Sequence, residues 1–359
     1  TLSGRNDWSS TLPKDSRSFF YPAANFALDV TSALGIESNT LSYAKVRAGW
    51  AQAGKDANPY QINSVFIQST MTDGFITQNA PIAQAIPAFE VGNQIGNANL
   101  QPEISTDIEL GADMKFLNDR VGLDVTLYQR NVKDNILAVA MPASSGYTAQ
   151  ILNIAELSNK GIEISLSGSL VQRGSFAWEA ALNWSKNVSR IEDLGGPSQI
   201  TVGGLGGNGL IARVGAPAFE IEGNAPLRDS QGRIVVNGAG LPRANPTQQV
   251  LGNTQYNWIG GVTNKLSYKG LSLAGTFDFR NGGVLYSRTA SLVYFSGTTP
   301  ATLYNDRRPF VIPNSVVQAV DAGGDPVVDD DGNPVYVENN TAINDSNGQV
   351  QNDWAAGGS

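Results

Sequence analysis

The most regular part of the sequence alternates apolar and polar residues between Pro102 and Ile136. In residues 104–116 the even positions are mostly apolar and the odd positions are polar, charged or glycine. After a short polar segment at 117–120, apolar residues return at every second position from Val121. Successive side chains of a strand point to opposite faces. The pattern therefore predicts an antiparallel hairpin with one apolar face and one charged face.

The same alternation predicts further strands on either side of this hairpin. They cover Thr1–Ser10, Asn25–Leu34, residues 43–50, Ile151–Leu170, Phe176–Ile191, Trp258–Lys269 and Leu271–Gly282. Tight turns are expected near 35–40, 117–120, 171–175 and 269–270, and loops over 11–22, 53–101, 138–150, 192–255 and from 283 onward. Short turns and long loops alternate along the chain, so all long loops leave the sheet on one side.

This arrangement is typical of an outer-membrane barrel with short periplasmic turns and long extracellular loops. Alternation by itself equally suits a soluble sandwich or a lipocalin-like barrel, but those folds have no reason to sort their loops by length. Large aromatic residues on the apolar faces form two groups, as expected at two membrane–water interfaces. Phe116, Phe176, Trp178 and Tyr268 lie near the short turns, and Trp50, Trp184 and Trp258 lie near the long loops. We therefore expect an all-β, antiparallel transmembrane β-barrel.

The composition excludes several kinds of binding site and catalytic group. The net charge of −8 leaves no basic surface for nucleic acid, and no apolar run is long enough for a membrane-spanning helix. The 359 residues include no cysteine and no histidine, which removes thiolate sites, the commonest general base and the commonest transition-metal ligand. We expect no cofactor, no resident metal and no enzyme activity. The chain opens without a signal peptide, so we expect its numbering to begin inside a larger protein.

Several stretches resemble the SusC/RagA group of TonB-dependent outer-membrane transporters of Bacteroidota. They are GRNDWSSTLP (4–13), FFYP (19–22), YAKVRAGWAQAG (43–54), LQPEISTDIELGADMKF (100–116), NDRVGLDVTLYQRNVKDNIL (118–137), PASSGY (142–147), NKGIEISLSG (159–168), FAWEAALNWSKN (176–187) and LSYKGLSLAGTFDFRNGG (266–283). The resemblance implies a 22-stranded barrel with an N-terminal plug, of which this chain supplies about nine strands. Residues 1–283 are then barrel strands with extracellular loops. Residues 284–359 are then expected to be an extracellular loop region that stops, at Trp354–Ser359, before the closing strands. The sequence as given contains no plug and no TonB box near Thr1, so we expect the missing parts to belong to the native protein outside it.

The resemblance also implies a function. A SusD-like lipoprotein lid would deliver an oligosaccharide or peptide to the lumen, and the TonB complex would act through the absent N-terminal region. Outer-membrane lipid would surround the barrel. No residue identifies the substrate. A passive porin and a soluble or surface-anchored glycan-binding β-protein are the alternatives.

The charged faces of the predicted strands supply the candidate site. Their residues are expected to line the lumen or to brace the plug: Asp107, Glu109, Asp113, Asp124, Arg130, Glu163, Glu179, Asp278 and Arg280. Pairs such as Asp107 and Glu109 also suit a glycosidase, but nearly every strand carries such carboxylates, so a structural role is favoured.

Two loop features have two interpretations each. The acidic run 321–331 suits a hard cation such as calcium, but it lacks EF-hand spacing, and a solvated hairpin tip is favoured. The loop aromatics can stack on sugars or pack the loops themselves, and none is assigned as a ligand contact: Tyr60, Phe75, Phe89, Tyr147, Tyr294, Phe295 and Tyr304.

Overall fold

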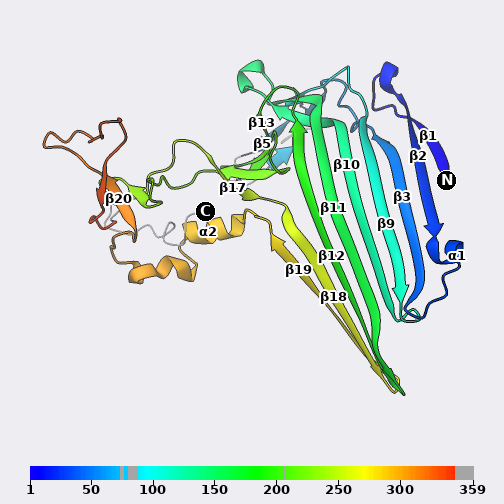
Figure 1. Ribbon diagram of the computed structural model, residues 1–359. Coiled ribbons are helices and arrows are strands. Elements are labelled where there is room, and N and C mark those ends of the chain that lie inside the picture. The colour runs from blue at the N-terminus through cyan, green and yellow to red at the C-terminus, as the bar shows by residue number, and fades with distance from the viewer. Residues whose placement is uncertain (73–76, 80–87, 206, 344–359) are drawn as a thin grey trace. The chain divides into compact units, whose positions relative to one another are not determined.

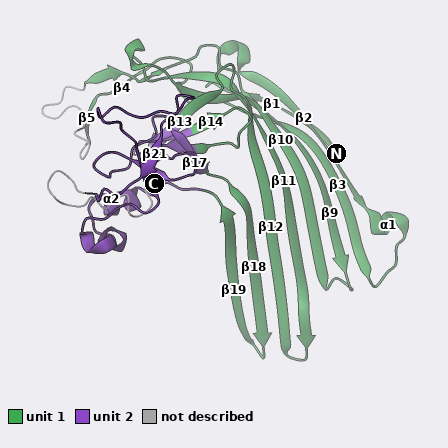
Figure 2. Ribbon diagram, turned by 60° about the vertical axis from the view of Figure 1, so that its left-hand side comes forward, with its two compact units in different colours: residues 1–202, 211–220, 253–283 green, residues 203–210, 221–252, 284–359 purple. Residues whose placement is uncertain are grey.

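The computed structural model describes residues 1–72, 77–79, 88–205 and 207–343. The chain forms two compact units, coloured separately in Figure 2. Unit 1 comprises residues 1–202, 211–220 and 253–283. Unit 2 comprises residues 203–210, 221–252 and 284–359.

Unit 1 is built on one antiparallel sheet whose nine consecutive strands follow the order of the chain (Figure 1). The strands are β1 (Leu2–Trp8), β2 (Ser18–Asp29), β3 (Leu41–Lys55), β9 (Glu103–Phe116), β10 (Val121–Ala140), β11 (Ala149–Arg173), β12 (Phe176–Asp193), β18 (Tyr256–Tyr268) and β19 (Leu271–Gly282). A two-residue strand, β8 (Gln94–Ile95), pairs in parallel with β11. Within the described residues β1 and β19 are open edges. The predicted all-β antiparallel fold is confirmed, as a partial barrel of about nine strands.

The hairpin of β9 and β10 forms as its sequence predicts. Leu110 pairs with Leu127 and Met114 with Leu123, so the apolar positions of both strands share a face. Leu117, Asn118 and Asp119 in the connecting turn have positive φ angles of 56°, 54° and 64°. The N–H of Leu117 donates to the Thr40 carbonyl at 3.0 Å, which ties this turn to the one before β3.

Two predictions near the N-terminus are wrong. The segment 11–22 is not wholly loop, because β2 begins at Ser18 and Phe19 pairs with Asp7 of β1. Aromatic residues favour strands, and the single Pro22 within them is not enough to prevent pairing. The segment 25–34 is not wholly strand. The Asp29 side chain accepts the N–H of Ser32 at 2.9 Å and begins α1 (Val30–Leu34).

The long loops also contain more structure than the sequence predicts. Within 53–101 lie β4 (Phe66–Gln68), β5 (Thr70–Thr72), β6 (Thr77–Asn79) and β7 (Phe89–Val91). Within 192–255 lie β13 (Gln199–Leu205), β14 (Asn208–Arg213), β15 (Glu220–Gly223), β16 (Ile234–Val236) and β17 (Gln249–Asn253). Short 3₁₀ turns occur at Lys14–Ser16 and Ala143–Ser145. Strand β10 continues to Ala140, so the loop predicted at 138–150 is shorter. These strands have only a few residues each, too few for an alternating pattern to be recognised.

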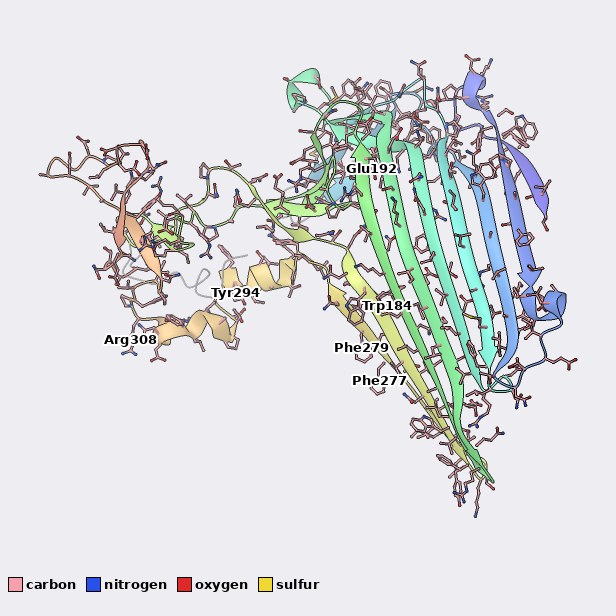
Figure 3. All side chains as sticks on the ribbon, viewed as in Figure 1. Trp184, Glu192, Phe277, Phe279, Tyr294 and Arg308 are labelled. Atoms are coloured by element: carbon pink, nitrogen blue, oxygen red, sulfur yellow. The ribbon has the colours of Figure 1, made fainter. Side chains whose placement is uncertain are left out.

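The buried residues of unit 1 gather where the long connections meet the sheet. One cluster contains Ala155, Ile191, Leu194, Ile200, Ala212 and Ala218, and another contains Leu12, Ala57, Leu100 and Ile151. The apolar face of the sheet, by contrast, has no protein layer over it among the described residues. Leu273 is 70% exposed and Phe277, labelled in Figure 3, is 63% exposed. This face is not the core of a sandwich. Across the described residues, helices are too short or too polar to span a membrane.

Unit 2 is not entirely loop after residue 283, contrary to prediction. It contains α2 (Arg288–Phe295), the 3₁₀ segment Pro300–Arg307, β20 (Ser315–Gln318) and β21 (Tyr336–Glu338). Ser287 begins α2 by accepting the N–H of Ala290 at 3.2 Å. Strands β16, β20 and β21 form a small sheet beside a buried cluster of Val236, Phe310, Ile312 and Ile343.

Unit 2 also repeats one tight turn four times. Within the described residues the turns begin at Asp229, Asn237, Asp321 and Asp329, and the last two lie in the acidic run 321–331, for which a solvated hairpin tip is predicted. In each turn the side-chain Oδ1 accepts the N–H groups of the second and fourth following residues, and a glycine with positive φ occupies the third. At Asp329 the acceptor distances are 3.0 Å from Asp331 and 2.8 Å from Asn333. The N–H of Asn333 is the main reason that the pKa of Asp329 is lowered.

Candidate functional site

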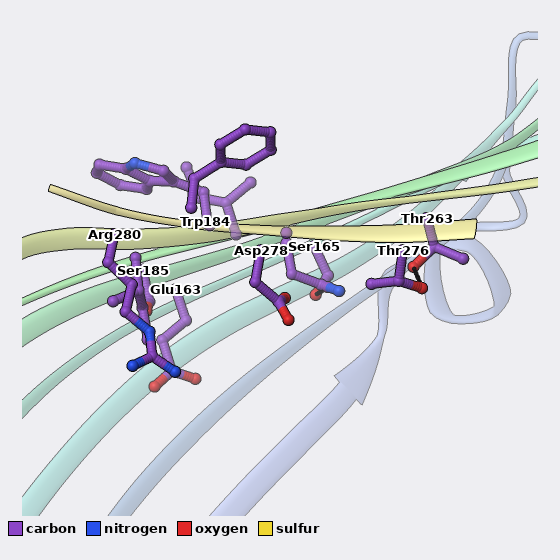
Figure 4. A pocket seen from close by; sticks show the side chains of 14 residues that line it. Glu163, Ser165, Trp184, Ser185, Thr263, Thr276, Asp278 and Arg280 are labelled. Atoms are coloured by element: carbon purple, nitrogen blue, oxygen red, sulfur yellow. Dashed lines mark hydrogen bonds between the residues drawn. The ribbon is translucent and has the colours of Figure 1, made fainter.

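The candidate site is the polar face of the large sheet. The strand register places all nine charged residues predicted for this face on it. In Figure 4 the charged groups of Glu163, Asp278 and Arg280 lie on one side of the strands and the Trp184 indole lies on the other. The alternation in sequence thus becomes a physical separation of charged and apolar surfaces.

Arg47 forms the centre of the most connected group on this face. Its Nη1 donates to Asp124 Oδ2 at 2.7 Å, and its Nη2 donates to Asp124 Oδ1 at 2.9 Å and to Thr126 Oγ1 at 2.5 Å. Its Nε lies 3.6 Å from Glu109 Oε1. A bidentate guanidinium–carboxylate pair fixes orientation as well as charge, so Arg47 of β3 is tied firmly to Asp124 of β10.

Arg47 reaches β10 only because a glycine occupies the strand between them. Gly111 of β9 lies opposite both Arg47 and Thr126. A Cβ at position 111 would lie 2.4 Å from Arg47 Nε and 2.8 Å from its Cζ. A glycine inside a strand often marks such a close approach. Gly111 therefore leaves the space through which the guanidinium crosses β9.

A second side chain crosses a strand glycine in the same way two strands further along the sheet, from β10 over β11 to β12. The Tyr128 ring lies over Gly161 of β11, where a Cβ would be 2.3 Å from its Cζ. Its hydroxyl lies 3.2 Å from Asn187 Oδ1 of β12 and donates to it. Beside it, Arg130 binds Asp107 through two bonds of 2.7 and 2.8 Å. Together these contacts cross-link β3, β9, β10, β11 and β12 over the polar face.

Several grooves are hollowed in this face of the described sheet, and two of them lie along its charged residues. One has a volume of about 650 Å³ and is lined by the ion pairs just described together with Asn159 and Glu163. The other, shown in Figure 4, has a volume of about 480 Å³ and includes Glu163, Ser165, Thr263, Thr276, Asp278 and Arg280. Toward the short turns, Lys265 Nζ donates to Glu179 Oε2 at 3.1 Å. The lining is rich in charged and polar side chains, and several of its carboxylates are paired with arginine or lysine, as suits a polar solute or a polar protein surface.

Three further side chains of this face are not among the residues predicted for the site, although all three lie on the predicted polar face: Arg47, Tyr128 and Asn187. The signal that identifies them is the glycine at mid-strand, Gly111 or Gly161, flanked by long polar residues on neighbouring strands. Such a signal needs the strand register, because the glycine and the side chain that covers it are far apart in sequence.

The seven aromatic residues assigned to membrane interfaces all lie on the apolar face by register. On β12 this face presents Phe176, Trp178, Ala180, Leu182 and Trp184, and on β9 it presents Ile108, Leu110, Ala112, Met114 and Phe116. Each stretch spans about nine residues, the length a tilted strand needs to cross a bilayer. Their position at the two membrane–water interfaces stays a prediction.

At the long-loop rim, polar contacts join connections that are distant in sequence. Ser9 Oγ and Thr11 Oγ1 donate to Asp56 Oδ2 at 2.5 and 3.1 Å. The hydrogen bond from Ser9 is the main reason that the pKa of Asp56 is lowered. The carboxylate of Asp56 therefore links the end of β3 to the connection between β1 and β2.

The two loop features lead to different outcomes. In the acidic run, Asp321 and Asp329 direct Oδ1 to backbone N–H groups of their own turns, which supports the hairpin-tip interpretation. Within the described residues, no group of three or more carboxylates gathers as a metal site. Among the loop aromatics, Tyr304 packs against Phe310 with ring centroids 4.6 Å apart, whereas Phe295 is 85% exposed. Phe75 lies outside the described residues.

Comparison with known proteins gives consistent results. The family described as TonB dependent receptor-like, beta-barrel matches residues 1–295. A TonB-dependent receptor of Formosa agariphila is 28% identical over 96% of this chain and 36% of its own length. TonB-dependent receptor SusC of Bacteroides thetaiotaomicron is 28% identical over 55% of this chain and 19% of its own. The RagAB peptide importer in its closed-closed state shares the fold, with a TM-score of 0.61 and 21% identity over 78% of this chain and 31% of that one. The chain spans about a third of the length of its Formosa relative.

Proposed function

Because the chain belongs to the TonB-dependent receptor β-barrel family and is of the SusC/RagA type, we propose that it forms part of the wall of an outer-membrane importer for a large polar nutrient. The resemblance stated from the sequence is confirmed by these relatives. TonB-dependent receptors are outer-membrane proteins of transport and reception, not enzymes.

The observation that carries this proposal is the separation of the two faces of one sheet. The apolar face has no covering layer among the described residues, and Leu110, Leu273 and Phe277 are between 55% and 70% exposed there. Such a surface is stable only against another apolar phase. The opposite face carries cross-strand ion pairs and several grooves. A closed barrel with these faces places acyl chains outside and a polar lumen inside.

We assign the charged residues of the polar face to the lumen, where they line the path or hold a plug. The Arg47 and Arg130 pairs suit the second role, since fixed charges on a rigid wall offer a defined docking surface. A SusD-like lipoprotein as lid and TonB as the source of energy follow from the SusC/RagA type. The substrate class is an oligosaccharide or a peptide; the solved RagAB relative is described as a peptide importer.

Neighbouring residues on β12 give a direct test of the two faces. The chain has no cysteine. Once any cysteines in the rest of the native protein are replaced, a single introduced cysteine reports the accessibility of its own position. Asn183→Cys on the polar face is expected to react with a water-soluble maleimide in intact outer membranes. Leu182→Cys is expected to react only after urea unfolding, because acyl chains shield it. Equal labelling of both before unfolding would contradict the membrane placement.

Active import is tested by uptake. Cells producing the native protein are offered fluorescent oligosaccharide and peptide pools, with and without an uncoupler that collapses the proton gradient. One pool is expected to accumulate only in energised cells that contain TonB. Uptake that survives the uncoupler would instead indicate a passive porin. Recovery of the protein in the soluble fraction without detergent would indicate the glycan-binding alternative.

A further inference from the structure

The outward face of β11 and β12 changes abruptly from apolar to basic. On β12, Trp184 is the last residue of the apolar series, and the next outward positions are Lys186, Val188 and Arg190. On β11, Lys160 is the next outward position beyond Ile162. Figure 3 labels Trp184 and Glu192, the residues between which the basic positions of β12 lie. The change occurs at the long-loop end of the band that we place in the membrane.

The three basic residues form an open triangle, which we call the basic triangle (Lys160, Lys186 and Arg190); its longest side, from Lys186 to Arg190 along β12, is about 13 Å. Lys160 pairs with Val188, so Lys186 and Arg190 are its two diagonal neighbours on the same face. Diagonal neighbours across a sheet are about 7–8 Å apart, within reach of one shared anionic group. All three side chains belong to exposed residues, and Val188 between them is 49% exposed.

Among the described residues, nearby carboxylates form no salt bridge with this triangle. Glu156 Oε1 lies 3.5 Å from Lys133 Nζ, and Glu192 accepts a short hydrogen bond from Ser158. Among the described residues, no salt bridge or side-chain hydrogen bond involves Lys160, Lys186 or Arg190. The chain as a whole has a net charge of −8, whereas the surface around Val188 carries three unpaired positive charges.

We propose that the basic triangle binds the phosphorylated headgroup of an outer-leaflet lipid whose acyl chains lie on the apolar band below it. Charge favours phosphate, and lysine and arginine are its usual partners. The adjoining band, with Ile162 and Trp184 at its upper edge, supplies the surface for the chains. A free anion would contact only the basic triangle and would leave the apolar band unused. The inference rests on the membrane placement in the proposed function.

The test uses the native protein in detergent and native mass spectrometry with synthetic bisphosphorylated lipid A as the probe. The triple variant Lys160→Gln, Lys186→Gln, Arg190→Gln is expected to bind the lipid at least about tenfold more weakly, the loss expected from even one charge-assisted hydrogen bond to phosphate. The matched control Lys14→Gln, Arg173→Gln, Arg243→Gln removes the same charge from other exposed positions and is expected to bind normally. The variant Lys160→Arg, Lys186→Arg is also expected to retain binding, which separates lost charge from lost folding.

Three results would overturn the inference. The first is that dephosphorylated lipid A binds as tightly as the bisphosphorylated form. The second is that inorganic phosphate alone displaces the lipid at equal concentration. The third is that the glutamine triple variant binds the lipid like the control. Failure of the membrane placement is recognised separately, because Leu182→Cys would then react without urea. Correct labelling with unchanged lipid binding would refute the lipid site alone.

Discussion

Replacing Leu166 by arginine is expected to destabilise the folded barrel in lipid by about 2–4 kcal/mol, the cost of a cation at mid-bilayer on a lipid-facing strand position. Leu166 lies near the middle of the apolar band of β11. It pairs with Leu123 on one side and Leu182 on the other, so an arginine there has no polar neighbour on its own face. Urea unfolding of the native protein in lipid vesicles measures the change.

The adjacent position provides the matched control. Ser165 lies on the polar face and donates to Asn183 Oδ1 at 2.6 Å, close to the groove that contains Glu163 and Asp278. Ser165→Arg adds the same side chain to the same strand, but into a hydrated acidic surface, and is expected to change stability by less than about 1 kcal/mol. If both variants lost the same stability, the apolar face would not be in contact with lipid.

Replacing Gly111 by valine is expected to cost about 1–3 kcal/mol. The new side chain would occupy the space of the Arg47 guanidinium, and the two bonds to Asp124 and the bond to Thr126 would be lost. Because the Arg47 and Asp124 side chains are 32% and 37% exposed, water screens their pairing, and the group of bonds as a whole contributes about as much as one hydrogen bond to a charged group, about 1.5–3 kcal/mol. The gain in strand propensity over glycine offsets at most about 1 kcal/mol. The same unfolding measurement in vesicles detects the difference.

Two comparisons isolate the cause. Gly275 of β19 also lies inside a strand, but a Cβ there would meet nothing within 4 Å, so Gly275→Val is expected to be neutral or slightly stabilising. In an Arg47→Ala background, Gly111→Val is expected to lose most of its cost, because no guanidinium remains to be displaced. An undiminished cost in that background would mean that Gly111 serves another purpose.

Much of the main sheet could be predicted because its strands are long and their alternation is strict. The faces of β9, β10, β11 and β12 followed from parity alone, since a side chain's face depends only on whether its position is odd or even. The predictions failed where a local interaction outweighed the pattern. Asp29 ends β2 by beginning a helix turn, and Phe19 to Tyr21 extend β2 although Pro22 follows them.

The candidate site also has one part that the sequence could predict and one part that it could not. Charged residues such as Asp107 and Glu163 could be assigned to the polar face from sequence, because a face is a property of each strand separately. Their partners could not, because Arg47 and Asp124 are 77 positions apart and meet only after three strands take their register. Gly111, which allows this contact, has no distinguishing feature in the sequence. Its role is recognised only from the residues paired with it, Arg47 and Thr126.

Local patterns were sufficient to predict an antiparallel sheet with an apolar and a charged face and with long loops on one rim, because alternation and turn spacing depend only on neighbouring residues. Three features required the folded chain: the absence of a covering layer on the apolar face among the described residues, the passage of Arg47 over β9 at Gly111, and the place of Lys160 between Lys186 and Arg190. These facts depend on register, which aligns residues that no local pattern connects.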